Sequence, residues 1–240
     1  MKILVVNDDG IYGRNLKILV NYLKKIYDEI MVVAPSTEQS AMSHRINIHG
    51  PIKLTKHDDL FDGVLTYSID STPADCVKFA VDNLKYDFDL VFSGINDGLN
   101  LGDDISYSGT VAAILEANYY DKRGIALSVV KGQTSGIEES LDAFFQDFLK
   151  NDIYIRYKTF NVNLPINPKG IKYVPQGYGN YEYYFTSEGD NIYIPRIRPK
   201  YQKRNIIETD QDAYYNNYIS VTPLTVDKTD YQVLNKINNK

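Results

Sequence analysis

The chain has 240 residues, of which 43% are hydrophobic, enough to fill one large globular core. Its formal net charge is −5 and its basic residues are scattered among acidic ones, which argues against a surface for duplex nucleic acid. Cys76 is the only cysteine, which excludes an intrachain disulfide and a Cys-rich zinc site and favours a reducing cytoplasm. No apolar run approaches the ~18 residues of a membrane helix, so we expect no membrane segment.

The first part of the chain alternates apolar runs with segments of helical period. Residues 2–7 predict a first strand, and Leu16, Leu19, Val20 and Leu23 then recur at helical spacing. Residues 29–34 predict a second strand that ends at a proline. These three segments form one βαβ unit, the building block of a parallel sheet covered by helices.

The same alternation continues to about residue 150. A helix is predicted to begin at Pro73, capped by Ser71 or Thr72, with Cys76 on its apolar side in the core. Further elements are expected in the order strand, helix, strand, helix, at residues 90–92, 110–120, 125–130 and 138–150. Residues 1–150 are therefore predicted to be an α/β core with a mostly parallel sheet.

After residue 150 the composition changes. Thirteen of the 21 tyrosines fall in residues 154–240, together with six prolines. Short candidate strands at residues 160–164, 191–194 and 219–222 favour hairpins or arms over a second independent core. We interpret residues 151–240 as the remaining core strands plus an extended tyrosine-rich arm of the same domain, of a kind that packs on a partner subunit.

Two adjacent carboxylates, Asp8 and Asp9, stand where the predicted first strand ends, in the run Asn7-Asp8-Asp9-Gly10. A turn eased by Gly10 can bring both side chains toward one ion, and carboxylate oxygens suit Mg²⁺, Mn²⁺ or Ca²⁺. Asp and Gly also dominate ordinary turns, so these residues alone leave both interpretations open.

A second polar loop, residues 93–104, begins where the strand around Val91 is expected to end, on the same sheet edge as Asp8. Ligands of open parallel sheets bind at that edge. Neither a GxGxxG fingerprint nor a P-loop is present in the sequence. Ser108, Gly109 and Thr110 then open a predicted helix, whose N-terminus can seat an anion such as phosphate or serve as a plain cap.

A third loop, residues 35–45, leaves the second strand at this edge and carries several hydroxyl groups, His44 and Arg45. It can offer a neutral oxygen to a metal. Two aspartates would neutralise a divalent ion, while Ser and Asn oxygens add coordination without repelling a phosphate. With only three histidines, of which His49 and His57 are interpreted as surface residues, a His-rich metal site is poorly supported.

Six segments taken in order resemble the SurE (survival protein E) family. They are residues 3–10, 33–40, 72–78, 93–113, 161–165 and 209–224. The resemblance spans nearly the whole chain. It departs from the family at Gly13-Arg14-Asn15, where an Ala-Pro-Gly stretch is common, and at Ala41, where Gly is usual. These departures affect loop shape and substrate preference more than the ligand positions.

The resemblance implies a metal-dependent phosphatase, of 5′-nucleotidase type, that hydrolyses nucleoside 5′- and 3′-monophosphates and in some members short polyphosphate. Asp8, Asp9, Ser40 and Asn96 would bind one divalent ion, Mg²⁺ or Mn²⁺, with Asp8, Asp9 and Asn96 catalytic. The phosphate would lie against Asn96, Ser108, Gly109 and Thr110. The family also implies a Rossmann-like, doubly wound fold with a C-terminal hairpin or arm that builds a homodimer or tetramer.

Two other functions compete with this interpretation. A receiver-like phosphoacceptor domain also places an acid pair after its first strand, but it would need Asp58 or Asp59 after a solid apolar strand, which residues 51–57 do not provide. A nonenzymatic oligomer that binds metal and nucleotide is the second competitor. Steady release of phosphate, abolished by a chelator, separates an enzyme from both.

Overall fold

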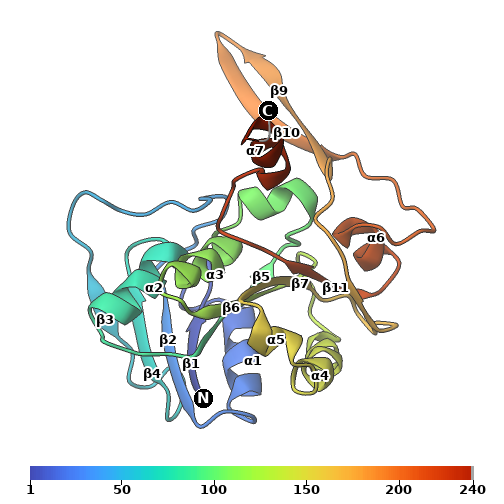
Figure 1. Ribbon diagram of the computed structural model, residues 1–240. Helices are drawn as coiled ribbons and strands as arrows, with labels where there is room; N and C mark the ends of the chain where they lie inside the picture. The colour runs from blue at the N-terminus through green and yellow to red at the C-terminus, as the bar shows by residue number, and fades with distance from the viewer. Residues whose placement is uncertain (239–240) are drawn as a thin grey trace.

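A computed structural model of the chain describes residues 1–238 (Figure 1). The last two residues of the predicted arm, 239–240, lie outside the described residues. The helices are α1 (Arg14–Leu23), α2 (Pro73–Asp82), η1, a 3₁₀ helix (Gly102–Ser106), α3 (Gly109–Tyr119), α4 (Ile137–Phe148), α5 (Ile153–Arg156), α6 (Asp210–Tyr215) and α7 (Tyr231–Asn238).

Nine strands form one sheet in the order β3-β4-β2-β1-β5-β6-β7-β11-β8. Their bounds are β1 (Lys2–Val6), β2 (Glu29–Pro35), β3 (Leu54–Lys56), β4 (Leu65–Ile69), β5 (Leu90–Asp97), β6 (Arg123–Val129), β7 (Thr159–Asn163), β8 (Ile171–Tyr173) and β11 (Ile219–Pro223). All neighbours are parallel except β3 with β4 and β7 with β11. The predicted α/β class with a mostly parallel sheet is confirmed.

Alternate residues of β1 enter two different cores, one on each face of the sheet. Ile3 and Val5 pack with the apolar stripe of α1 and with α4, whereas Leu4 and Val6 pack with α2 and α3. Cys76 of α2 is fully buried in the second core, as predicted. Packing of helices on both faces therefore holds β1, and with it the turn that follows its carboxyl end, in a fixed position.

The carboxyl end of β1 lies at the switch point of the sheet. From β1 the chain moves to β2 on one side and later to β5 on the other. In open α/β sheets this reversal leaves a crevice outside the strand ends, where ligands bind. By contrast β3 is the edge strand, and Asp58 pairs there with Lys56 at the surface, far along the sheet order from β1. The receiver-like arrangement is therefore not formed.

Two of the segments expected as hairpins or arms belong to the main sheet. Residues 160–164 and 219–222 lie largely in β7 and β11, which pair antiparallel and bury Val162 and Val221 completely. The true hairpin is formed by β9 (Tyr181–Gly189) and β10 (Ile192–Pro199). Residues after about 200 therefore do not form a separate arm, because they include β11 of the core.

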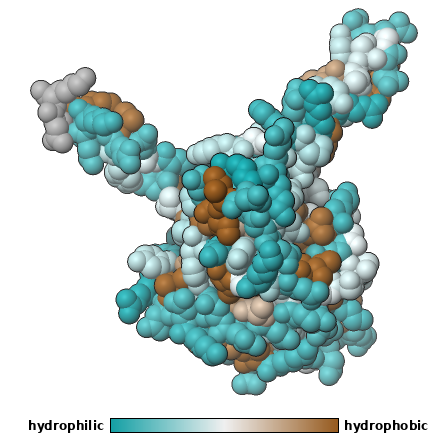
Figure 2. All heavy atoms as spheres, turned by 90° about the vertical axis from the view of Figure 1, so that its right-hand side faces the viewer, coloured by the Kyte–Doolittle hydropathy of each residue, from teal (hydrophilic) through white to brown (hydrophobic). Residues whose placement is uncertain are grey.

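The β9–β10 hairpin and α7 project from the body of the molecule. They overlap in Figure 1, but the rotated view of Figure 2 shows that they extend in different directions. Most hairpin residues are exposed, including Phe185 at 71%, and α7 has no buried residue. Within the described residues, no helix is long and apolar enough to cross a membrane.

Candidate active site at the carboxyl edge of the sheet

The turn after β1 is held by a hydrogen bond between two of its own residues, Asn7 and Gly10. The Asn7 side-chain amide donates to the carbonyl of Gly10 at 2.8 Å. Gly10 has φ +90°, and a Cβ there would also lie 3.1 Å from the backbone of Thr37. A glycine therefore lets the turn pass tightly under the loop that follows β2. Asp8 and Asp9 are therefore held close to the loop that follows β2.

Asp8 is 3% exposed and is bound by the start of α3. The Thr110 hydroxyl donates to Asp8 Oδ1 at 2.5 Å, and the Thr110 backbone N–H donates to Oδ2 at 3.2 Å. Burial raises the pKa of Asp8, while these two hydrogen bonds lower it. Thr110 thus orients a carboxylate as well as lying in the segment predicted to seat the phosphate.

Gly109 permits this close approach of α3 to the acid pair. A Cβ at Gly109 would lie 3.1 Å from the Cβ of Asp8 and 3.1 Å from Pro73 Cγ. The contact is tighter than side chains normally tolerate, so the position requires glycine for packing rather than for backbone conformation. The positive end of the helix dipole is consequently aimed at the Asp8 side of the site.

Asp9 is less buried than Asp8 and has an unusual pKa. Burial, then the charge of Asp8 and to a lesser extent those of Asp97 and Glu38, raises the pKa of Asp9 to about 7, although a hydrogen bond from the Asp97 backbone N–H at 3.3 Å opposes this. Four acidic side chains therefore act on one another at this edge. A cation bound among them would lower this electrostatic repulsion.

The loop after β2 is attached to both neighbouring loops. The Gln39 N–H donates to the backbone carbonyl of Asp8 at 2.7 Å, and the Ser43 N–H donates to that of Tyr107 at 2.9 Å. Ser40 is exposed, and its hydroxyl donates to the Glu38 carboxylate at 2.7 Å. Ser40 thus stands next to the residue that contacts Asp8, but its hydroxyl is turned toward Glu38.

Asn96 is half-buried at the end of β5, beside the residue that contacts Asp9. Its side-chain Nδ2 donates to the Gly98 carbonyl at 2.7 Å, which leaves Oδ1 as the available ligand atom. The strand extends to Asp97 rather than ending near Val91, and its pairing with β6 shifts between Ser93 and Asn96. This extension brings Asn96 to the sheet edge.

Ser108 caps α3, since its Oγ accepts from the Val111 N–H at 3.1 Å. It is 7% exposed, and Thr110 is fully buried. Ser108 to Thr110, which are three of the four residues predicted to bind the phosphate, therefore form one segment next to Asp8. The first turn of the helix supplies N–H dipoles that favour an anion.

Four further residues belong to this edge and were not singled out as site residues from the sequence: Arg14, Asn15, Glu38 and Asp97. A cavity of about 160 Å³ is lined by Asp9, Arg14, Asn15 and Asp97. Arg14 donates from Nη2 to the Gln133 carbonyl at 2.7 Å, which holds its guanidinium there. Glu38 acts through its charge on Asp8 and Asp9. Only Asp97 carried a sequence signal, its place directly after Asn96.

The donor chemistry is that of a hard-metal site with few charges. Among residues 1–238, no group of three or more His, Cys, Asp or Glu side chains is arranged to hold a metal ion. The edge instead offers two adjacent carboxylates and the neutral oxygens of Asn96 and Ser40. Oxygen donors of this kind fit Mg²⁺ or Mn²⁺, provided that Ser40 turns from Glu38.

Comparisons with known proteins point to one family. Residues 3–183 match the family described as Survival protein SurE. Over its full length the chain is 38% identical to the "5'-nucleotidase SurE" of Thermoanaerobacter sp. (strain X514), covering 98% of that protein. It is 35% identical to the protein of the same name from Alkaliphilus metalliredigens (strain QYMF), again covering all of this chain and 98% of the relative.

A solved structure agrees with the sequence matches. The crystal structure of the SurE protein from Aquifex aeolicus superimposes with a TM-score of 0.81 at 32% identity, covering all of this chain and 99% of that one. Full-length coverage means that the β1 turn, the loop after β2 and the start of α3 all fall within the matched region. The chain belongs to the SurE family.

Proposed function

We propose that the protein is a metal-dependent phosphatase that hydrolyses nucleoside 5′-monophosphates to nucleoside and phosphate, and that it also accepts 3′-monophosphates and short polyphosphate. It is a phosphoric monoester hydrolase of the 5′-nucleotidase type that its relatives' names describe. The observation that carries the proposal is the contact between Asp8 and the first turn of α3. That contact places the proposed metal ligand Asp8 directly beside the helix N-terminus that would bind the phosphate.

One divalent ion, Mg²⁺ or Mn²⁺, would be held by Asp8, Asp9, Ser40 and Asn96. The raised pKa of Asp9 supports this, because it reflects crowded negative charge that a cation would relieve. The Asn96 amide supports it too, because its Nδ2 is engaged and its oxygen remains. When bound, such an ion neutralises charge on the phosphoryl group and activates a water nucleophile.

The remaining groups of the site position the phosphate. The N-terminus of α3 at Ser108 to Thr110 would favour the phosphoryl oxygens through the positive end of the helix dipole, because negative charge on them must be stabilised in the transition state. Thr110 keeps Asp8 in one orientation, and Gly109 keeps the helix close enough for both tasks. Arg14 adds a cationic donor beside Asp9.

The projecting β9–β10 hairpin supports assembly into a homodimer or tetramer. Register places Tyr183, Phe185, Pro195 and Ile197 on one face, and the side chains of Tyr183, Phe185 and Ile197 are 57%, 71% and 60% exposed. An apolar face of this kind is stabilised by burial, and a second copy of the chain is the partner we propose. A reducing cytoplasm is the compartment we propose.

The test is the release of inorganic phosphate from AMP by the purified full-length protein, with Mg²⁺ or Mn²⁺ added and then removed by a chelator. We expect steady multiple turnover that stops when the metal is removed and resumes when it is restored. Binding of nucleotide without turnover would contradict the proposal and support a nonenzymatic binding protein. A panel of 5′- and 3′-monophosphates in the same assay tests the wider substrate range.

A further inference from the structure

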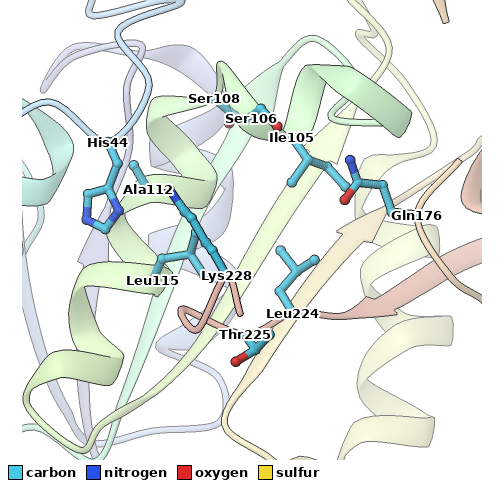
Figure 3. A pocket seen from close by; sticks show the side chains of 10 residues that line it. All are labelled: His44, Ile105, Ser106, Ser108, Ala112, Leu115, Gln176, Leu224, Thr225 and Lys228. Atoms are coloured by element: carbon cyan, nitrogen blue, oxygen red, sulfur yellow. The ribbon is translucent and has the colours of Figure 1, made fainter. Parts of the chain in front are cut away.

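A second cavity, of about 210 Å³, lies along the flank of α3 (Figure 3). Its lining includes Ser108, the residue that caps α3 and begins the predicted phosphate pocket. Ala112 and Leu115 continue the lining along the helix, one and two turns further on. The cavity is therefore adjacent to the phosphate end of the site, on the side that leads away from the acid pair.

The lining combines four apolar residues with six polar ones, which are His44, Ser106, Ser108, Gln176, Thr225 and Lys228. In Figure 3, Leu115 and Leu224 lie within the cavity wall, while His44 and Gln176 lie at opposite sides. Small-molecule sites combine apolar surface, against which a ligand packs, with polar groups that orient it, and both kinds of residue are present here. An aromatic base can pack against such walls, and hydroxyl groups can pair with the polar rim.

Two of the polar side chains, Gln176 and His44, are held in place by hydrogen bonds. Gln176 donates from Nε2 to the Gly102 carbonyl at 2.9 Å, so its Oε1 is left as an acceptor. The His44 Nε2 lies 2.8 Å from the Glu116 carboxylate, a side chain buried in α3, so the ring is anchored and Nδ1 remains for a ligand. An anchored acceptor and an anchored ring are suited to orient a ligand.

We propose that this cavity is the subsite for the nucleoside part of the substrate, that is, the base with its ribose. The inference rests on the proposed function, because it assigns the other half of the same monophosphate. The cavity of about 210 Å³ is smaller than the ~300–1,000 Å³ typical of drug-sized ligand sites, which limits it to one nucleoside and excludes a dinucleotide. The phosphate would remain at the N-terminus of α3 while the nucleoside lies along its flank.

Thr225 provides the test, because it lines the cavity and is exposed, so a large side chain can enter the cavity without disturbing the core. Thr229 is an exposed threonine four residues later that does not line the cavity, and it is the matched control. Thr225→Trp should raise the KM for AMP at least tenfold, while kcat/KM for phenyl phosphate stays within twofold. Thr229→Trp should leave both substrates within twofold of the original protein.

Calorimetric titration of the full-length protein with adenosine keeps the test independent of turnover. Adenosine should bind the original protein and the Thr229→Trp variant, and binding should be lost in Thr225→Trp. Equal adenosine binding by all three proteins, or equal loss of AMP and phenyl phosphate hydrolysis in Thr225→Trp, would overturn the subsite. Adenosine binding without hydrolysis of any monophosphate would instead retain the subsite and refute the phosphatase.

Discussion

The carboxyl edge of the sheet and the β9–β10 hairpin place their side chains in opposite environments. At the edge, the acidic residue Asp8 is 3% exposed and is bound by Thr110. On the hairpin, apolar Phe185 and Ile197 are 71% and 60% exposed. For the first region we propose a divalent cation as the ligand, and for the second an apolar surface of another copy of the chain. The two regions therefore differ in the chemistry of the partner that we propose for each: a cation for the buried acids and an apolar surface for the hairpin.

The largest effect is expected from neutralising Asp8 or Asp9, which tests whether the buried acids serve catalysis. Asp8→Asn and Asp9→Asn should each lower kcat for AMP by about a thousandfold or more, which corresponds to about 4 kcal/mol of activation free energy. The fold should remain, because an amide keeps the shape of the carboxylate and the crowded negative charge is reduced. Steady-state kinetics and thermal unfolding by circular dichroism measure both effects.

Asp59→Asn is the control for charge removal, because Asp59 is an exposed acid beyond the edge strand β3. It should leave kcat within twofold. An unchanged kcat in either the Asp8 or the Asp9 variant, with normal metal present, would refute the assignment of the site. A collapse of the thermal transition in those variants would mean that the acids serve stability rather than chemistry.

The hairpin is tested by removing its apolar face without touching β11. Phe185→Ser combined with Ile197→Ser should lower the molar mass measured by light scattering to that of a smaller assembly or a monomer, since both residues lie on the same exposed face. Tyr12→Ser is the control, because Tyr12 is a 74% exposed aromatic residue outside the hairpin, and this variant should keep the original mass. Retention of the full mass by the double variant would show that the hairpin face is not the interface.

A smaller effect is expected where the C-terminal segment joins the core. Burial opposes ionisation of Asp212, but hydrogen bonds from Arg204, Tyr201 and Thr209 outweigh it and lower the pKa of Asp212 to about 2. Because this folded-state pKa lies below the unfolded value of 3.8, the contribution is complete above pH 3.8 and is lost as the pH falls through 2. It amounts to about 2 kcal/mol.

Arg204→Met should therefore lower the free energy of unfolding in urea by ~1–3 kcal/mol at pH 6, and the difference from the original protein should shrink as the pH approaches 2. Arg156→Met removes an exposed ion pair with Asp152 and should cost less than ~0.5 kcal/mol at either pH. If the Arg204 variant shows the same deficit at pH 6 and pH 2, packing rather than charge accounts for that deficit.

The elements of the parallel core could be predicted from the sequence because their signals are local. The apolar period of α1, the Pro73 start of α2 and the run of β1 each depend on neighbouring residues, and Thr72 proves to be the cap of α2. The end of β5 was not predicted. Gly94 suggests a break, but here it allows close approach to β6, since a Cβ would lie 2.3 Å from the Leu127 carbonyl oxygen.

The loops that form the candidate site could be predicted from the sequence, but the contacts between their side chains could not. Parallel strands deliver their following loops to one edge, so Asp8 and Asn96 could be grouped from sequence order alone. The two hydrogen bonds from Thr110 to Asp8 could not, because they depend on the approach of a helix about 100 residues away that Gly109 makes possible. Arg14 belongs to no motif and is placed by the Gln133 carbonyl.

The pairing of β7 with β11 has a consequence for synthesis. About 60 residues separate Val162 from its partner Val221, and the second strand lies near the end of the chain. During translation the earlier strands can assemble first, while the β7 side of the sheet stays open as an unprotected edge that can pair with another chain. Pairing of β11 with β7 and β8 therefore closes a sheet edge that would otherwise be open to aggregation.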